Sequence, residues 1–146
     1  MTSEPPGTPP VQGGWVVSHG VDIAEVARLA ASIERHGDRF LSRVFTDAER
    51  AYCESNKRAA EHFAARFAAK EAVFKALGTG WAQGTSWRDV EVTRAESGAP
   101  GVRLTGRAAD VARGLGISAW SLSLSHTETT AIASAIGLRG GGVTAV

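Results

Sequence analysis

The spacing of hydrophobic residues changes along the chain from strand-like to helix-like. Residues 15–23 (WVVSHGVDI) form a valine-rich run that predicts a buried strand, and residues 24–37 follow with apolar positions three or four apart. Thr46 and Glu49 have the spacing of a capping box, so a short helix is predicted to begin near Asp47. The longest helical pattern covers about residues 59–77 and ends before Gly78, a residue type that commonly terminates helices.

The second half of the chain contains shorter elements. Residues 87–95 alternate as in a strand, and residues 102–106 (VRLTG) predict another short strand after a SGAPG turn. A helix is predicted to begin at Thr105 or Gly106 and to end at Gly114 or Gly116, and residues 119–126 and 129–137 predict a hairpin. We therefore expect an α+β fold, with a small, mostly antiparallel sheet packed with one long and several shorter helices.

The composition of the chain limits the cellular environments, the number of domains and the binding functions that it can have. The chain has 146 residues and a net charge of +1, so it fits one domain and gives no general case for binding nucleic acid or membranes. A single cysteine excludes an intrachain disulfide framework and favours a reducing, cytoplasmic setting. We expect a disordered Pro- and Gly-rich leader at 1–14, a domain at 15–137 and a flexible tail at 138–146.

The long helix places charges beside an aromatic stripe. Phe63, Phe67 and Phe74 share one face at about 100° per residue; Lys70 falls on that face and Glu71 about 80° to its side. Lys70 must therefore snorkel, form an ion pair or reach a substrate. Glu71 and Lys75 are four apart and predict a helix salt bridge.

Asp22 gives Glu71 a second interpretation. A carboxylate near the end of a strand is either the N-cap of the next helix or a metal ligand. Two separated carboxylates, Asp22 and Glu71, without a Cys or His cluster suit Mg²⁺, whose remaining ligands come from water and substrate phosphates.

Three further features of the sequence each have more than one interpretation. The Gly78–Thr79–Gly80 turn is a helix C-cap, or it lets a ligand approach the backbone, or both. Ser125 and His126 are adjacent on a strand and point to opposite faces, so they do not form a nucleophile–base pair; His126 is a polar substrate contact or a turn residue. Four arginines on or after the first helix form a solvated face or a docking patch for an acidic partner: Arg28, Arg35, Arg39 and Arg43.

These motifs together resemble one family. GVDIAEVAR, RVFTDAE, RFAAKEAVFKALGTG, WRDVEV, SGAPGVRLTGRA and SLSHT occur in this order between Val16 and Ile136. The sequence closely resembles the holo-acyl-carrier-protein synthases, the small single-domain phosphopantetheinyl transferases. The resemblance implies transfer of the 4′-phosphopantetheine arm from coenzyme A to a serine of an apo acyl carrier protein, with Mg²⁺, in the bacterial cytoplasm. It also implies a homotrimer with active sites at the subunit interfaces.

The resemblance assigns roles to individual positions. Asp22 and Glu71 match the Mg²⁺ ligands, and Lys75 matches the lysine held near the phosphates of coenzyme A. Arg28 matches the arginine that engages the carrier protein. The positions that match the nucleotide site are Arg66, Gly78, Thr79, Gly80, Ser125 and His126. Glu71, directly or through a water, is our candidate for the base that accepts the serine proton.

The sequence departs from the family pattern at two places. His19 stands where the family often has glycine, and Phe74 is bulkier than the residue often found between the motif's glutamate and second lysine. A non-catalytic module that binds coenzyme A or a carrier protein is the alternative function, and a metal-dependent phosphoanhydride hydrolase is a third. The motifs do not distinguish a carrier protein of fatty-acid synthesis from those of polyketide or peptide synthesis.

Overall fold

The computed structural model describes residues 15–78 and 84–140. Strands and helices follow one another in an order close to the predicted one. The elements are β1 (Trp15–Glu25), α1 (Val26–His36), α2 (Asp38–Val44), α3 (Asp47–Glu54), α4 (Ala59–Leu77), the 3₁₀ helix η1 (Trp87–Asp89), β2 (Val90–Arg94), β3 (Pro100–Leu104), α5 (Gly106–Leu115), β4 (Ala119–His126) and β5 (Thr130–Arg139).

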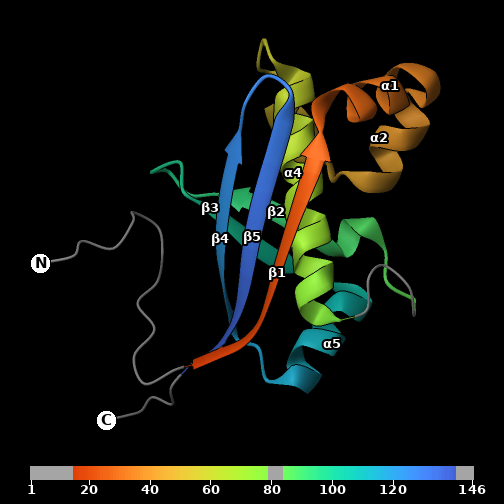
Figure 1. The fold of residues 1–146 in the computed structure, drawn as a ribbon. Helices are drawn as coiled ribbons and strands as arrows, with labels where there is room; N and C mark the ends of the chain where they lie inside the picture. The colour runs from red at the N-terminus through yellow and green to blue at the C-terminus, as the bar shows by residue number, and fades with distance from the viewer. Residues whose placement is uncertain (1–14, 79–83, 141–146) are drawn as a thin grey trace, which may run out of the picture.

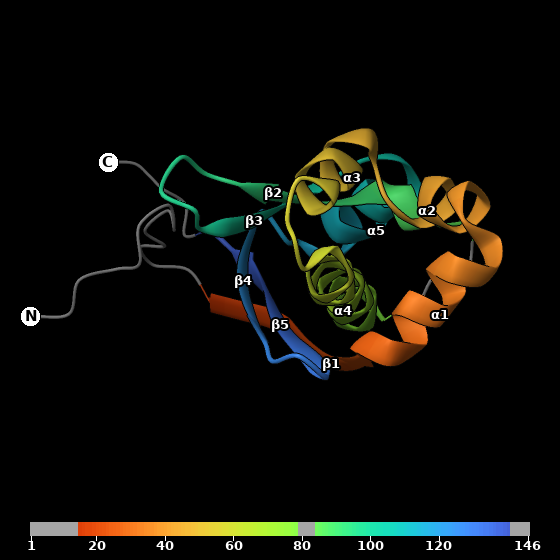
Figure 2. The same ribbon diagram turned by 90° about the horizontal axis from the view of Figure 1, so that it is seen from above.

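The strands form two antiparallel sheets. The larger has the order β1-β5-β4, and β2 pairs only with β3. Helix α4 lies along one face of the larger sheet, with α1 and α2 at one end and α3, α5 and the β2–β3 pair on its other side (Figures 1 and 2). The α+β class is confirmed, but the small sheet expected from the sequence is divided in two. Within the described residues, no helix has the length and apolar character that a membrane span requires.

Alanine brings α4 close to the larger sheet. Ala64, Ala68 and Ala72 of α4 are fully buried, and so are Ala131 and Ala135 of β5. Small side chains on both surfaces allow the backbones to approach closely, while the larger residues fill the space between α4 and the remaining helices. Helix α4 is therefore the centre of the core.

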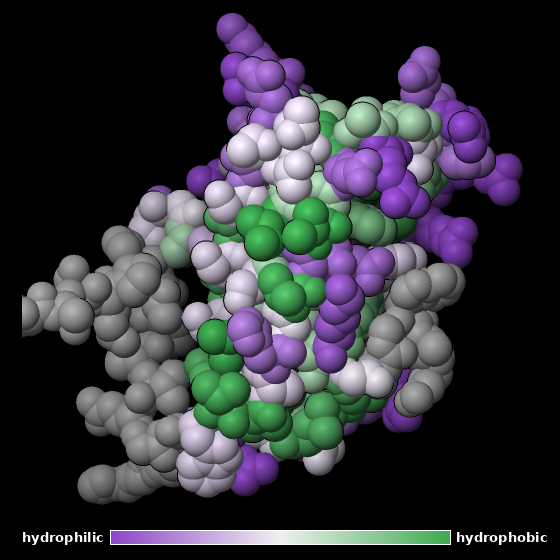
Figure 3. Space-filling model, viewed as in Figure 1, coloured by the Kyte–Doolittle hydropathy of each residue, from purple (hydrophilic) through white to green (hydrophobic). Residues whose placement is uncertain are grey.

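The predicted burial of β1 is wrong. Strand β1 lies at the edge of its sheet, and α4 covers only one of its faces. Residues at even positions, Gly20 and Ala24, are buried, whereas Val21 and Ile23 are 49% and 64% exposed. Figure 3 shows apolar residues exposed on the open face of the sheet. The alternation also directs Asp22 toward α4, because it lies between the two buried positions.

The structure defines the ends of several helices and strands more closely than the sequence pattern does. The capping box at Thr46 and Glu49 is present, and Gly37, Gly78 and Gly116 are the C-caps of α1, α4 and α5. The sequence pattern missed α2. Strand β5 continues to Arg139, two residues beyond the domain boundary expected at 137. The expected leader at 1–14 and the end of the expected tail, 141–146, lie outside the described residues.

Candidate active site

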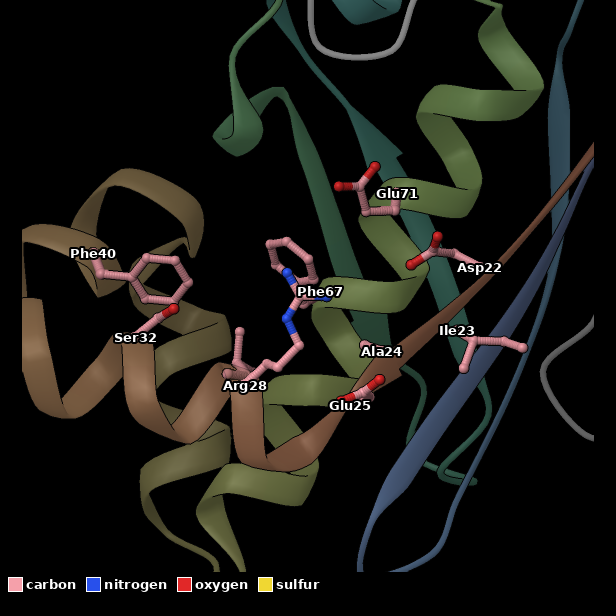
Figure 4. Close-up of a pocket in the computed structure, with 10 residues that line it drawn as sticks. Asp22, Ile23, Ala24, Glu25, Arg28, Ser32, Phe40, Phe67 and Glu71 are labelled. Carbon is pink, nitrogen blue, oxygen red and sulfur yellow. The ribbon is translucent and has the colours of Figure 1, made fainter.

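A cavity of about 610 Å³ brings Asp22 and Glu71 together. Asp22 comes from β1 and Glu71 from the middle of α4, and both carboxylates point into the cavity (Figure 4). Arg28 extends from α1 toward the same space, with its guanidinium group near Phe67. Two carboxylates that are 49 positions apart in sequence are thus neighbours, as the Mg²⁺ hypothesis requires.

Lys75 pairs with Asp22. Its Nζ atom lies 2.9 Å from Asp22 Oδ1 and donates a second hydrogen bond to the carbonyl of Val21 at 3.1 Å. The helix salt bridge predicted between Glu71 and Lys75 is absent from the ion pairs of the described residues. The N-cap of α1 is Glu25, so the capping interpretation of Asp22 is also wrong. Both local alternatives to a functional role for Asp22 and Glu71 are therefore excluded.

The electrostatics of Glu71 show a repulsion between two carboxylates that Lys75 compensates only in part. Burial raises the pKa of Glu71, the Asp22 carboxylate raises it further, and Lys75 partly opposes the shift. Divalent cations relieve this kind of repulsion between carboxylates. No cluster of three or more potential metal ligands occurs among the described residues. The pair therefore fits Mg²⁺, which commonly binds one or two carboxylates and takes its other ligands from water and substrate phosphates.

Gly20 determines how closely Asp22 approaches α4. A Cβ atom at this position would lie 2.0 Å from the Ala72 carbonyl oxygen and 2.8 Å from the Ala76 amide nitrogen. Both atoms belong to the helix backbone, so neither can rotate away. The glycine before the motif's aspartate is thus required by the contact between β1 and α4.

We expect Gly20→Ala to destabilise the fold and to separate the two carboxylates. Overpacking typically costs about 1–3 kcal/mol, and relief here requires β1 to move away from α4. Urea unfolding measures the loss, and Gly114→Ala is a matched control because a Cβ there meets nothing within 4 Å. Equal free energies of unfolding for the two variants would contradict this account.

Two of the remaining predicted site residues lie around a second cavity. Arg66 and His126 line a cavity of about 440 Å³, together with Tyr52, His62 and Arg94. Arg66 and Glu71 are five residues apart on α4, which separates them by about 140° around the helix axis. The structure therefore divides the predicted site between two sides of α4.

The other nucleotide-site predictions have mixed outcomes. Ser125 is exposed on β4 and is not among the residues that line the second cavity, although its neighbour His126 is. Gly78 adopts the left-handed conformation with φ 78° and caps α4, so the C-cap interpretation is confirmed. Thr79 and Gly80 lie outside the described residues.

Two residues beside His126, Glu61 and His62, were not predicted from the sequence. Glu61 Oε1 lies 3.1 Å from His126 Nδ1, and the rings of His62 and His126 are 5.4 Å apart. Glu61 is largely buried. The first turn of α4 and the end of β4 are 65 residues apart in sequence. No local spacing in the sequence signals this contact.

We expect stability to fall with decreasing pH partly through His62. Burial lowers the pKa of His62, and the nearby His126 and Arg66 lower it further. The unfolded chain then binds a proton more readily than the folded one, so this stability is present above about pH 6.5 and is lost below it. Unfolding of His62→Gln between about pH 5 and 7 should show a shallower pH dependence than wild type. An unchanged slope would contradict the assignment.

Lys70 faces away from both cavities and forms a buried ion pair. Its side chain is fully buried, and Nζ lies 2.8 Å from Glu49 Oε1. It also donates hydrogen bonds to the carbonyls of Trp87, at 3.2 Å, and Val90. Of the three alternatives for Lys70, the ion pair is therefore confirmed.

The sequence and the structure both match a known group of enzymes. Residues 18–133 match the family model of the 4′-phosphopantetheinyl transferase superfamily. The holo-[acyl-carrier-protein] synthase of Koribacter versatilis is 54% identical over 121 residues, which cover 83% of this chain and 97% of that protein. The synthase of Desulforudis audaxviator is 52% identical over the same length, with 83% and 92% coverage.

Solved structures agree with these relatives. The holo-[acyl-carrier-protein] synthase of Neisseria meningitidis superposes with a TM-score of 0.76 at 31% identity and covers 84% of this chain and 98% of its own. The Helicobacter pylori synthase, solved in complex with coenzyme A, superposes with a TM-score of 0.72 at 29% identity, covering 82% and 98%. The chain therefore belongs to the 4′-phosphopantetheinyl transferase superfamily and, within it, to the holo-acyl-carrier-protein synthases.

Proposed function

We propose that this enzyme transfers the 4′-phosphopantetheine arm of coenzyme A to a serine of an apo acyl carrier protein, with Mg²⁺, and releases 3′,5′-ADP. The observation that carries the proposal is the cavity in which Asp22 and Glu71 face each other with Lys75 beside them. The relatives named above supply the substrate class. We further propose a carrier protein of fatty-acid synthesis and a cytoplasmic location, in keeping with the family resemblance.

The residues of the first cavity have separate roles in this reaction. Asp22 and Glu71 would hold Mg²⁺, which supplies positive charge to the pyrophosphate and to the leaving group. The serine oxygen forms a bond to the β-phosphorus, and the bond from that phosphorus to the bridging oxygen breaks. The serine proton passes to Glu71, directly or through a water. Lys75 adds a positive charge beside the phosphates.

The arginines of α1 and α2 are suited to docking the carrier protein. Arg28 lines the catalytic cavity itself, and Arg39 and Arg43 line an adjoining hollow with His36 and Phe40. A basic surface at the mouth of the cavity would attract an acidic partner and present its serine to the pyrophosphate. Arg28 is therefore our candidate for the main carrier-protein contact.

We also propose that the enzyme is a homotrimer with composite active sites. Trp15, Val16, Val21, Ile23 and Ile132 are each more than 40% exposed on β1 and β5. This apolar surface favours association with further copies of the chain. The division of the predicted site between two sides of α4 favours a heterologous contact, in which Glu71 of one copy meets Arg66 of the next.

Complementation between two inactive variants tests the composite site. Glu71→Gln and Arg66→Gln proteins, unfolded together and refolded at equal concentrations, should recover about a quarter of wild-type transfer, because about one contact in four joins two intact halves. Each variant refolded alone is the control. Without recovery, both halves of the site would have to act within one chain.

The decisive experiment for the function is the mass of the carrier protein. The full chain is incubated with coenzyme A, Mg²⁺ and an apo acyl carrier protein, and the carrier is weighed by mass spectrometry. A gain of one phosphopantetheine arm supports the transferase. An unmodified carrier with retained coenzyme A would indicate the binding module, and cleavage of coenzyme A without a carrier would indicate a hydrolase.

A further inference from the structure

Arg50 of α3 connects that helix to α2 through its whole guanidinium group. Its Nη2 atom donates to Asp38 Oδ1 at 2.9 Å, and its Nη1 atom donates to Ser42 Oγ at 3.1 Å. Its Nε atom donates to Glu54 Oε1, within α3, at 3.2 Å. Because the guanidinium is planar and presents its donors as a rigid fork, three simultaneous partners define its position closely. We call the two bonds to Asp38 and Ser42 the Arg50 bridge.

Helix α2 depends on such contacts because it is short. It has seven residues, and its N-cap, Gly37, has no side chain that could accept a hydrogen bond from the first turn. Leu41 and Val44 are buried and hold the inner side of α2 against the core. On the outer side, Arg88 Nη1 also donates to the Ser42 carbonyl, at 3.5 Å. Bonds from two arginines therefore restrain the outer side of a helix whose own backbone bonds are few.

The Arg50 bridge orients the side of α2 that we propose for docking. Asp38 and Ser42 are four apart and so lie on one side of α2. Arg39 and Arg43 each follow one of them directly, which places both arginines about 100° further around the helix. They line the hollow beside the first cavity, together with Phe40. Rotation of α2 about its axis would turn both arginines away from this hollow, and the bridge on the adjacent side opposes that rotation.

We propose that Arg50 is a positioning residue for the carrier protein, because its bridge to α2 fixes the direction of Arg39 and Arg43. The identity of the partner rests on the proposed function. Exposed ion pairs contribute little to global stability, so the effect of the bridge is local order in α2. The bridge uses Asp38, a carboxylate that is 89% exposed beside a surface for an acidic partner. By charge alone Asp38 repels that partner, so the sign of its effect on binding separates positioning from charge attraction.

Calorimetric titration of the full chain with an apo acyl carrier protein, without coenzyme A, tests the bridge. If Asp38 acted only by its charge, Asp38→Asn would tighten binding of an acidic carrier. The bridge predicts the opposite: Asp38→Asn should bind about threefold more weakly, and Arg50→Gln about tenfold more weakly, than wild type. Glu54→Gln is the matched control, because it removes an equal charge beside the same arginine but lies within α3, and it should bind like wild type. Tighter binding by Asp38→Asn, or equal effects of Asp38→Asn and Glu54→Gln, would overturn the proposal.

Two further variants separate the bridge from charge and from helix stability. Arg50→Lys keeps the charge but not the fork that holds two partners, so it should lose most of the affinity that Arg50→Gln loses. Adding Asp38→Asn to Arg50→Gln should cause no further weakening, because the bond is already absent. Additive losses would instead assign the effect of Asp38→Asn to the first turn of α2. That result, or wild-type affinity in Arg50→Lys, would overturn the bridge.

Hydrogen exchange measures the order of α2 without any partner. In the Arg50→Gln protein, the amides of Leu41 and Phe45, which donate to carbonyls one turn earlier, should exchange about tenfold faster than in wild type. The amides of α4 and the thermal midpoint should be unchanged. Arg113→Gln, which breaks an exposed pair with Asp110 on α5, is the control for the loss of a surface arginine. Unchanged exchange in α2 would overturn the proposal.

Steady-state kinetics distinguish failure of this proposal from failure of the proposed function. In the transferase reaction, Arg50→Gln should raise KM for the carrier protein about tenfold and leave kcat and KM for coenzyme A unchanged, a division that a general loss of fold would not give. A wild-type protein that binds the carrier without modifying it, with the affinities of the variants in the order given above, would refute the transferase and support the bridge. A wild-type protein that modifies the carrier, with an Arg50→Gln variant of unchanged KM, would do the reverse.

Discussion

Glu71→Gln is expected to lower kcat/KM for transfer at least about 10³-fold, because one change removes both a metal ligand and the proposed base. The folded protein should not lose stability. Glu71 is one of two carboxylates that repel each other across the first cavity, and the described residues give it no ion-pair partner. Replacing it with a neutral isostere relieves that repulsion, so the thermal midpoint should equal or exceed that of wild type. Carboxylates placed unfavourably for stability are typical of functional sites.

The controls for Glu71→Gln are chosen by exposure and by role. Glu54→Gln removes a charge from the surface of α3, where Glu54 pairs with Arg50, and should change neither transfer nor the thermal midpoint by a measurable amount. Asp22→Asn should reduce transfer as Glu71→Gln does, but it also breaks the contact with Lys75. Turnover near the wild-type rate in Glu71→Gln would remove this residue from the metal site.

Local spacing in the sequence predicted the wrong ion-pair partner for Lys75. The i,i+4 rule paired Lys75 with Glu71, whereas the folded chain pairs it with Asp22, 53 residues away. Lys75 pairs with Asp22 because Gly20 lets β1 approach the backbone of α4. A rule based on spacing within one helix does not take that strand into account. The spacing of Asp22 and Glu71 in sequence has no period, so they were joined by the ligand preference of Mg²⁺ for carboxylates and by the family motifs.

The fold was predictable where the signal was local. The capping box at Thr46 and the terminating glycines carry their mechanism within a few residues, and the structure contains both. The exposure of one face of β1 was not predictable. Val21 and Ile23 are residue types that are usually buried, but they lie on a face that α4 does not cover. The division of the site had a usable signal: Arg66 and Glu71 are about 140° apart on one helix and cannot share one cavity wall.

The sequence left three alternatives open for Lys70. Substitution of this residue has the largest expected effect on stability. Its ammonium group is satisfied by the Glu49 carboxylate and by the carbonyls of Trp87 and Val90. Glu49 in turn accepts hydrogen bonds from the backbone amides of Thr46, at 2.8 Å, and Val92, at 2.7 Å. One buried pair therefore ties together α3, α4, η1 and β2. Burial lowers the pKa of Lys70, and Glu49 opposes this shift.

Lys70→Met should destabilise the protein by about 3–5 kcal/mol, because it leaves the Glu49 carboxylate buried without its cation. Adding Glu49→Gln removes that uncompensated charge while the amide oxygen still accepts from Val92, so the double variant should be more stable than Lys70→Met alone. Urea unfolding measures both, with the exposed Lys57→Met as control. A cost below about 1 kcal/mol for Lys70→Met would show that the pair contributes little. Lys70 therefore supports the helix that presents Glu71 without entering the cavity itself.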